Sequence, residues 1–387
     1  MLAIPVKKLR EGMVVAQSIY SKAGAALLVK GKQLKHQYIH QMKKIGIPSI
    51  SVTAVDPHFH VETPEDVIQE KTRMDAIKVV HSVFKDISEK HEMDTEGLAQ
   101  AANRIVTDII ARREHLVQLT DIRLHDTYTF AHSVNVAVLS AIMGKFSGLT
   151  EDEMKTLVMG GLLHDLGKIS VSPAVLNKNG RLTDAEFEEI KTHPMEGAHR
   201  IHQFEWTLPK ASILAAIAAQ HHEHVDGSGY PRGIGGDRMH RFAKMVSIAD
   251  VYDALTSERP YKKAYTPSVA YSIMMKTDKS HFDGELLEQF FDHVAVYPVG
   301  TVLKTFYGYG IVKKCEFGHT RTPTVCIFAD NKRKPLERPY IIDLKNDSSQ
   351  TIEKEFSGNE LMEFTHNLRV DPSKYLCEEE TDKMAGA

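Results

Sequence analysis

Histidine and aspartate side chains recur in the middle of the chain in a pattern that suggests metal chemistry. Between residues 121 and 262 they occur as His132, His164-Asp165 in HDLGK, His193, His221-His222 in HHEHVDGSGYP, and Asp250 in SIADVYDAL. Imidazole and carboxylate groups are common ligands of divalent first-row metal ions. These seven groups exceed what one ion requires, so the pattern favours a two-metal centre.

A two-metal centre would suit phosphate chemistry. Two ions a few ångströms apart can share a bridging hydroxide and hold both the attacking and the leaving oxygen of a phosphate displacement. The adjacent pair His164-Asp165 fits this role, because its carboxylate can bridge two ions while its imidazole binds one of them.

Single histidines have a plainer interpretation. A lone histidine on an apolar helix is more often a hydrogen-bonded core residue or a surface residue than a ligand, and an isolated HD dipeptide carries little information. A zinc-protease HExxH motif is excluded, because Asp226 stands where a histidine would have to follow His222-Glu223. The order of the motifs along the chain therefore decides the interpretation.

The ordered motifs resemble one known family. HDLGK, a lone His193, HHEHVDGSGYP and Asp250 in an apolar helix are together similar to the HD-GYP branch of the HD phosphohydrolase superfamily, over about Asp121 to Lys263. The resemblance implies a phosphodiesterase of bacterial second-messenger signalling that hydrolyses cyclic dinucleotides, chiefly cyclic di-GMP.

The resemblance also implies a ligand set. The family's metal ligands map onto His132, His164, Asp165, His193, His221, His222 and Asp250. Asp165 would be the bridging carboxylate. Family members generally use iron or manganese, but the mixed ligands also fit Co, Ni or Zn, so the sequence leaves the metal open. Some members have a Glu four residues before the first histidine that helps hold a third metal. Tyr128 stands there, so we expect two ions per chain.

We expect a small group of residues to bind and cleave the substrate. The expected catalytic residues are Asp165 and Lys168, and the expected substrate contacts are Asp126, Lys168, Gly229, Tyr230, Arg259 and Lys262. Lys168 follows the HD pair closely and is the natural cation for a non-bridging phosphate oxygen. In the family, the Gly-Tyr-Pro segment and the segment after the last Asp contact the dinucleotide. Without the resemblance, Arg259 and Lys262 would fit a solvated basic turn.

The expected reaction is metal-assisted hydrolysis of a 3′-5′ phosphodiester. A metal-bridging hydroxide would attack phosphorus in line while the ions and Lys168 stabilise the charge on the phosphate. Cyclic di-GMP would yield linear pGpG and, with further cleavage, GMP. Two alternatives stay open: a phosphodiesterase for 3′,3′-cyclic GMP-AMP, and a catalytically silent sensor that binds nucleotide or a protein partner. The complete ligand set favours an active enzyme.

Composition restricts the partners and the compartment. A net charge of −3 and a pI near 6.7 argue against DNA or RNA as a partner. The cysteines, Cys315, Cys326 and Cys377, lack CxxC spacing and are expected to be reduced thiols. No apolar run reaches the roughly 18 residues needed to span a bilayer, and the N-terminus lacks a signal-peptide pattern. We therefore predict a cytoplasmic protein without a membrane partner.

Protein partners could bind the Gly-Tyr-Pro loop or the N-terminal module, and the chain could form a homodimer.

The predicted fold is mainly α and has four consecutive parts. These are a small α+β prelude or regulatory module at 1–60, a helical connector at 61–120, an all-helical HD-GYP domain at 121–295, and a β-rich extension with a frayed acidic tail at 296–387. In the first part, β-prone runs at 13–16, 26–29 and 47–52 surround an amphipathic stretch at 35–44. This module is similar to the prelude domain often found ahead of HD-GYP domains.

Helices are expected to position the motifs. Residues 63–66 carry a helix-start signature, and a second helical run covers 95–119. Capping signatures at 150–153 and 183–186 predict helices that end at His164-Asp165 and near His193-Pro194. Apolar residues 213–220 predict a helix that ends at His221-His222, and 242–255 predict a helix with Asp250 and Asp253 on one face.

Overall fold

The computed structural model describes most of the chain and divides it into two compact units. It describes residues 2–16, 18–20, 26–47, 49–53, 67–112, 128–178, 180–257, 264–346, 352–368 and 371–376. One unit, the helical unit, contains the described residues of Val67–Glu114 and Asp126–Phe290. The other, the mixed unit, contains those of Met1–Asp66 and Phe291–Ala387. Two ends of the chain that are far apart in sequence therefore belong to one unit.

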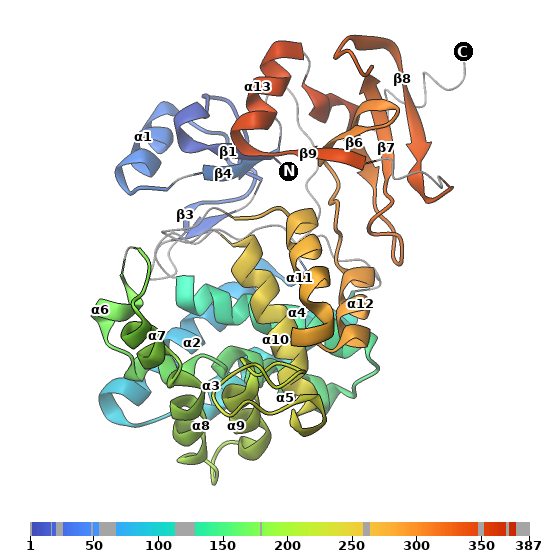
Figure 1. Cartoon of the computed structure of the whole chain (residues 1–387). Coiled ribbons are helices and arrows are strands. Elements are labelled where there is room, and N and C mark those ends of the chain that lie inside the picture. Colours follow the sequence, from blue (N-terminus) through green and yellow to red (C-terminus); the bar gives the residue numbers. More distant parts are fainter. Residues whose placement is uncertain are drawn as a thin grey trace. The chain divides into compact units, whose positions relative to one another are not determined.

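All regular elements described in the helical unit are helices (Figure 1). The longer ones are α2 (Glu70–Lys90), α3 (Thr95–Ala111), α4 (Tyr128–Phe146), α5 (Glu151–Leu163), α8 (His193–His202), α9 (Ala211–Gln220), α10 (Arg241–Thr256), α11 (Pro267–His281) and α12 (Gly284–His293). Shorter ones are η2 (Leu166–Ser170), α6 (Pro173–Leu176), α7 (Asp184–Ile190) and η3 (Gly236–Arg238). No described helix combines the length and the apolar character needed to cross a membrane.

Helix α5 is largely buried and contacts α3, α4, α9 and α10. Its sequence explains where it begins and how closely it packs. The Thr150 side chain accepts a hydrogen bond from the backbone N–H of Glu153, and Glu153 bonds back to Thr150, so a capping box starts the helix. Near its end α5 packs closely against α4, since a Cβ added at Gly161 would lie 2.8 Å from the Cα of Ala137. Glycine at this position allows two helices that carry site residues to approach each other.

The mixed unit is built from small antiparallel sheets. Strands β1 (Leu2–Pro5) and β4 (Ser49–Val52) form one pair, and β2 (Ile19–Tyr20) and β3 (Ala26–Leu28) form another. A five-stranded sheet has the order β8-β7-β6-β5-β9. Its strands are β5 (Val302–Thr305), β6 (Gly308–Lys314), β7 (Thr324–Ala329), β8 (Pro335–Asp343) and β9 (Ile352–Phe356). The unit also has helices η1 (Val6–Lys8), α1 (His36–Lys44), η4 (Leu344–Asn346), α13 (Gly358–Leu368) and η5 (Pro372–Leu376).

One hydrophobic cluster contains residues from both the N-terminal and the C-terminal part of the mixed unit. Ile4 of β1 and Val52 of β4 are fully buried in the same apolar cluster as Phe328 of β7 and Phe364 of α13. Cys315 and Cys326 are buried free thiols, whereas Cys377 lies outside the described residues. The sequence did not predict this shared core, because residues 1–60 and 296–387 are separated by the whole helical unit.

The predicted fold class is confirmed: the regular elements described within 121–295 are helices, a five-stranded antiparallel sheet follows them, and the N-terminal part mixes strands with helices. The β-prone run at 13–16 forms isolated bridges and not a regular strand. Val14 forms an isolated bridge with Gln33 while Val15 forms one with Val52, so no continuous ladder develops. The predicted helix start at 63–66 lies outside the described residues, as do 113–119 of the second predicted helical run.

Candidate metal centre

Four helices and a helix start bring their histidines and aspartates to one place. His132 lies on α4, His164 is the residue that ends α5, His221 ends α9, and Asp250 lies in α10. His193 opens α8, where Pro194 fits because the first turn of a helix lacks partners for its backbone N–H groups. Most of these side chains are buried, as are Asp165 and the carboxylate of Asp250. The motifs that are scattered in sequence therefore share one buried site.

Close approach of α8 to the HD motif depends on Gly167. A Cβ added at Gly167 would lie 1.9 Å from the carbonyl oxygen of His193 and 2.5 Å from the backbone nitrogen of Gly197. Both neighbours are backbone atoms, which cannot move aside as a flexible side chain could. The glycine of HDLGK therefore lets His193 reach the HD pair.

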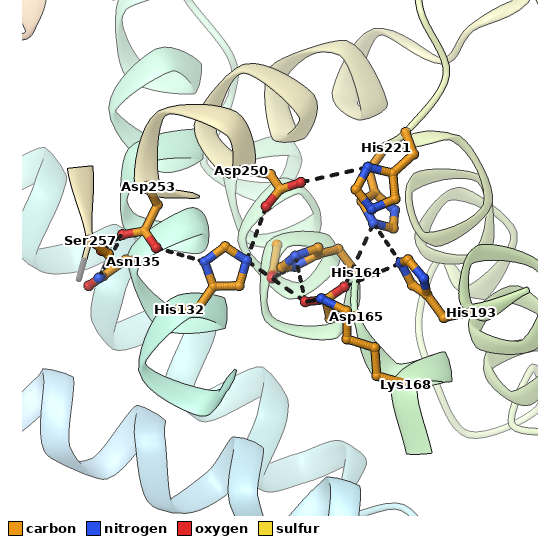
Figure 2. Close-up of polar contacts among 12 residues, drawn as sticks. His132, Asn135, His164, Asp165, Lys168, His193, His221, Asp250, Asp253 and Ser257 are labelled. Atoms are coloured by element: carbon orange, nitrogen blue, oxygen red, sulfur yellow. Dashed lines mark hydrogen bonds and ion pairs between the residues drawn. The ribbon is translucent and has the colours of Figure 1, made fainter. Parts of the chain in front are cut away.

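Asp165 lies between two groups of ligand-type side chains (Figure 2). Its Oδ2 is 3.4 Å from Nε2 of His164 and 3.8 Å from Nε2 of His132. Its Oδ1 is 3.4 Å from Nε2 of His193 and 3.8 Å from Nε2 of His221. The Asp165 carboxylate thus directs one oxygen toward His132 and His164 and the other toward His193 and His221.

The donor atoms form three overlapping groups that could each hold a metal ion. The groups are His132, His164 and Asp250; His193, His221 and His222; and His164, Asp165 and His221. Within each group the ligand atoms lie within 4.8 Å of one another. His222 is the least buried histidine of the set, and its Nδ1 lies 3.9 Å from Asp250. This donor set suits ions that accept both imidazole and carboxylate ligands.

Backbone carbonyls orient three of the imidazoles. In each case the ring Nδ1 lies 2.7 or 2.8 Å from the carbonyl three residues earlier: Gly161 for His164, Ile190 for His193 and Ala218 for His221. A carbonyl can only accept, so Nδ1 carries the proton and Nε2 keeps a lone pair. The Nε2 atoms of His193 and His221 lie only 3.2 Å apart. Nε2 of His164 and Oδ1 of Asp165 are buried and have no hydrogen-bond partner among the described residues. Buried lone pairs that converge in this way fit a cation.

Burial keeps most of the imidazoles neutral, as metal ligands must be. It lowers the pKa of His193 to about 4 and that of His222 to about 3, and it holds the pKa of His221 well below its ordinary value. Burial acts against ionisation of Asp165, but Lys168 and the adjacent histidines outweigh it and keep the pKa of that carboxyl well below its usual range. The carboxylate is therefore charged at neutral pH.

His132 differs because two carboxylates flank its ring. Its Nε2 lies 3.0 Å from Asp250 and its Nδ1 lies 2.7 Å from Asp253. Burial would lower the pKa of His132, but these two hydrogen bonds raise it from 6.5 to about 9. Asp253 also accepts a hydrogen bond from Asn135 at 2.8 Å and one from Ser257 at 3.1 Å. The Asp253 carboxylate, itself held by Asn135 and Ser257, thus fixes the orientation of the His132 ring through Nδ1, the ring nitrogen that does not face Asp250.

The Gly-Tyr-Pro loop folds over the histidines at one side of the site. The side chain of Glu223, fully buried, accepts hydrogen bonds from the backbone N–H groups of Arg232 at 2.8 Å and Ile234 at 3.0 Å. The Tyr230 N–H donates to the carbonyl of His222 at 3.1 Å, and the two rings stack with centroids 4.7 Å apart. Burial raises the pKa of the Tyr230 hydroxyl, so it stays protonated. Glu223 therefore holds the loop in place with Tyr230 against a candidate ligand.

Comparison with known proteins gives the family. The HD domain family matches residues 104–286. A cyclic di-GMP phosphodiesterase of Pseudomonas aeruginosa is 30% identical over 370 residues, which cover 88% of this chain and 88% of that protein. The chain belongs to the HD-GYP family of cyclic-dinucleotide phosphodiesterases. The resemblance found from the motifs is thereby confirmed.

Other relatives match a smaller share of this chain. The 3′3′-cGAMP-specific phosphodiesterase 3 of Vibrio cholerae is 36% identical over 158 residues, which are 41% of this chain and 34% of that protein. The cyclic di-GMP phosphodiesterase response regulator RpfG of Xanthomonas campestris pv. campestris is 30% identical over 214 residues, which are 55% and 52% of the two chains. This chain thus spans about a third and about half of the lengths of these two relatives.

The HD-GYP site contains most of the residues predicted from sequence. All seven predicted ligands lie in the three overlapping donor groups. Lys168 donates to Asp165 at 2.5 Å, and Gly229 and Tyr230 lie in the loop that covers His222. Asp126, Arg259 and Lys262 lie outside the described residues, and so does the side chain of Tyr128.

Two structural roles in the HD-GYP site were missed from the sequence. Asp253 was placed on the same helix face as Asp250, but its hydrogen bond to His132 depends on how α10 packs against α4. The i, i+3 spacing of the two aspartates was the available signal. Glu223 follows the His pair directly, and only the path of the loop shows that its carboxylate accepts two backbone N–H groups.

Proposed function

We propose that this chain hydrolyses cyclic di-GMP to pGpG, with further cleavage to GMP, using two divalent metal ions. The observation that carries the proposal is the position of Asp165, whose two oxygens face different histidines at 3.4 Å on each side. The ligands of one ion would be His132, His164 and Asp250, those of the other would be His193, His221 and His222, and Asp165 would bridge them. Iron or manganese is the proposed metal.

The chain's own residues support such a reaction. Bound divalent ions would supply Lewis acidity and would activate water at neutral pH. The Lys168 ammonium, about a quarter exposed beside Asp165, is placed to bind a non-bridging phosphate oxygen and to stabilise charge that develops there. Tyr230 stays neutral beside His222, so it can donate a hydrogen bond to a phosphate or sugar oxygen.

The relative that matches most of this chain favours cyclic di-GMP as the substrate. The relative of Pseudomonas aeruginosa that matches 88% of this chain carries the name of a cyclic di-GMP phosphodiesterase. A second candidate substrate is 3′,3′-cyclic GMP-AMP, since a relative with 36% identity over 158 residues is named for it. Two predicted substrate contacts, Arg259 and Lys262, lie outside the described residues.

The direct test is turnover by protein purified without oxygen, with its metal content measured on the same sample. We expect pGpG or GMP from cyclic di-GMP and about two metal ions per chain. Faster turnover of 3′,3′-cyclic GMP-AMP would select the second substrate. Full metal occupancy without turnover of either nucleotide would instead identify a silent sensor.

The variant Asp165→Ala tests the bridging role. It should reduce turnover at least about a thousandfold, because both ions would lose a shared ligand. The charge that develops on the phosphate would then be stabilised less well. Circular dichroism should show an unchanged helix content. Glu89→Ala, a substitution at an exposed position of α2, is the control and should keep its activity. Substantial turnover by Asp165→Ala would contradict the proposed role.

A further inference from the structure

A short row of rings extends from the candidate metal centre to the surface. The His222 ring stacks on Tyr230, with centroids 4.7 Å apart and an angle of 25° between the planes. The Phe187 ring of α7 then meets Tyr230 with centroids 6.4 Å apart at 71°. We call Phe187, Lys191 and Tyr230 the α7 shelf. It provides aromatic surface next to the place where a phosphodiester would be cleaved.

Packing does not explain why Phe187 is on this shelf. No residue of α7 is buried, and the Phe187 side chain is 44% exposed. Yet α7 is held firmly. Glu186 closes a capping box with Thr183 and pairs with Lys178 at 2.6 Å, and Glu189 accepts the backbone N–H of Ser172 at 2.7 Å. A well-anchored helix that leaves a large apolar ring exposed is suited to bind a ligand.

The C-terminal end of α7 is connected directly to the candidate metal centre. The carbonyl of Ile190, the last residue of α7, accepts the Nδ1–H of His193 at 2.7 Å. The spacing between the shelf and the metal ligand is therefore fixed by one hydrogen bond and a two-residue connection. A ligand that contacts both would be positioned without a large rearrangement of the chain.

Lys191 adds a donor to the aromatic surface. Its Nζ lies 4.8 Å from the centroid of Phe187 and 5.9 Å from that of Tyr230. It also pairs with Glu188 at 2.6 Å, but the Glu188 side chain is 68% exposed. An exposed ion pair of this kind contributes little stability, so Lys191 can exchange this partner for a ligand acceptor at low cost.

We propose that Phe187 and Lys191 form a nucleobase subsite of the active site, in which a guanine stacks on Phe187 and accepts hydrogen bonds from Lys191. This subsite rests on the proposed hydrolysis of a guanine-containing cyclic dinucleotide. Aromatic faces bind bases by stacking, and lysine donates to the O6 and N7 acceptors of guanine. Adenine presents an amino group where guanine has O6, so Lys191 disfavours adenine at this subsite.

The experiment compares a nucleotide substrate with a phosphodiester that has no base. Phe187→Ala should raise the KM for cyclic di-GMP about tenfold through the loss of stacking. Phe187→Trp should retain a KM near that of the wild type. Turnover of methyl p-nitrophenyl phosphate should be unchanged in both variants, and so should metal content. Trp206→Ala removes a ring that is 90% exposed in the same unit and is the matched control.

A second variant tests the base preference. Lys191→Met keeps the length of the side chain but removes its donors, and it should reduce the preference for cyclic di-GMP over cyclic di-AMP by about tenfold. If the wild type cleaves cyclic di-GMP and Phe187→Ala has the same KM, the subsite is disproved while the proposed function stands. If the wild type cleaves only the base-free diester, the proposed function fails, and the subsite falls with it.

Discussion

At the residue scale, the site combines ligand atoms with groups that orient them. Three histidines direct Nε2 inward because a carbonyl three residues earlier holds Nδ1. The Nδ1 of His132 contacts the Asp253 carboxylate at 2.7 Å. A carboxylate behind a metal-binding imidazole fixes the ring and increases its basicity. Asp253 is thus a positioning residue for His132.

Asp253→Asn should weaken metal binding without unfolding the site. The amide can still accept a hydrogen bond from His132, but it lacks the negative charge that makes the ring a stronger ligand, so metal affinity should fall about 10–100-fold. Titration with a competing chelator measures this loss, and added metal should restore much of the activity. Asn135→Ala is the control, because it removes a different hydrogen bond of Asp253 and leaves His132 in contact. Equal metal affinity in Asp253→Asn and wild type would refute the positioning role.

The seven candidate ligands could be predicted because each lies in a motif whose residue types have few alternative roles. The residues around them could not. Whether Asp253 contacts His132, or Phe187 approaches Tyr230, depends on the packing of helices that are distant in sequence. Side-chain types alone do not determine such contacts.

At the element scale, local signals predicted most of the helix bounds around the site, but not the helix break before His193. The capping boxes at Thr150 and Thr183 are present as predicted, since they depend on residues three positions apart. His193 was expected near the end of a helix, whereas it opens the separate helix α8. The contact between α8 and Gly167 explains this arrangement, and it involves backbone atoms that no local pattern reveals.

Gly167→Ala should therefore disturb α8 and the metal centre together. The new Cβ would meet the backbone of His193 and Gly197, so α8 must move and the free energy of unfolding should fall by about 1–3 kcal/mol. Metal content should fall as well, because His193 moves with the helix. Urea unfolding and metal analysis measure the two effects.

Gly284→Ala is the matched control for this substitution. An added Cβ at Gly284 meets nothing within 4 Å, so stability and metal content should stay close to those of the wild type. Wild-type behaviour of Gly167→Ala would show that α8 does not need this close approach.

At the scale of the whole molecule, the N-terminal and C-terminal parts of the chain pack into one unit. The cluster that buries Ile4 and Val52 also buries Phe328 and Phe364. Alternation of apolar residues predicted β-structure in both regions, but it contains no information about which strands share a core. Hydrophobic burial is non-directional, so the partner of an apolar face emerges only from the complete fold.

Ile4→Ala should therefore weaken the C-terminal sheet, although Ile4 lies in the first strand of the chain. Removing a fully buried isoleucine side chain typically costs about 2–5 kcal/mol, and the loss should spread through the shared cluster. Hydrogen exchange should show faster exchange in β5, β6 and β7, while α4, α5 and α9 keep their protection. Leu157→Ala, at a fully buried position of α5, is the reciprocal control and should reverse that pattern. Unchanged protection of the sheet in Ile4→Ala would mean that the N-terminal strands and the C-terminal sheet are energetically independent, in spite of the core they share.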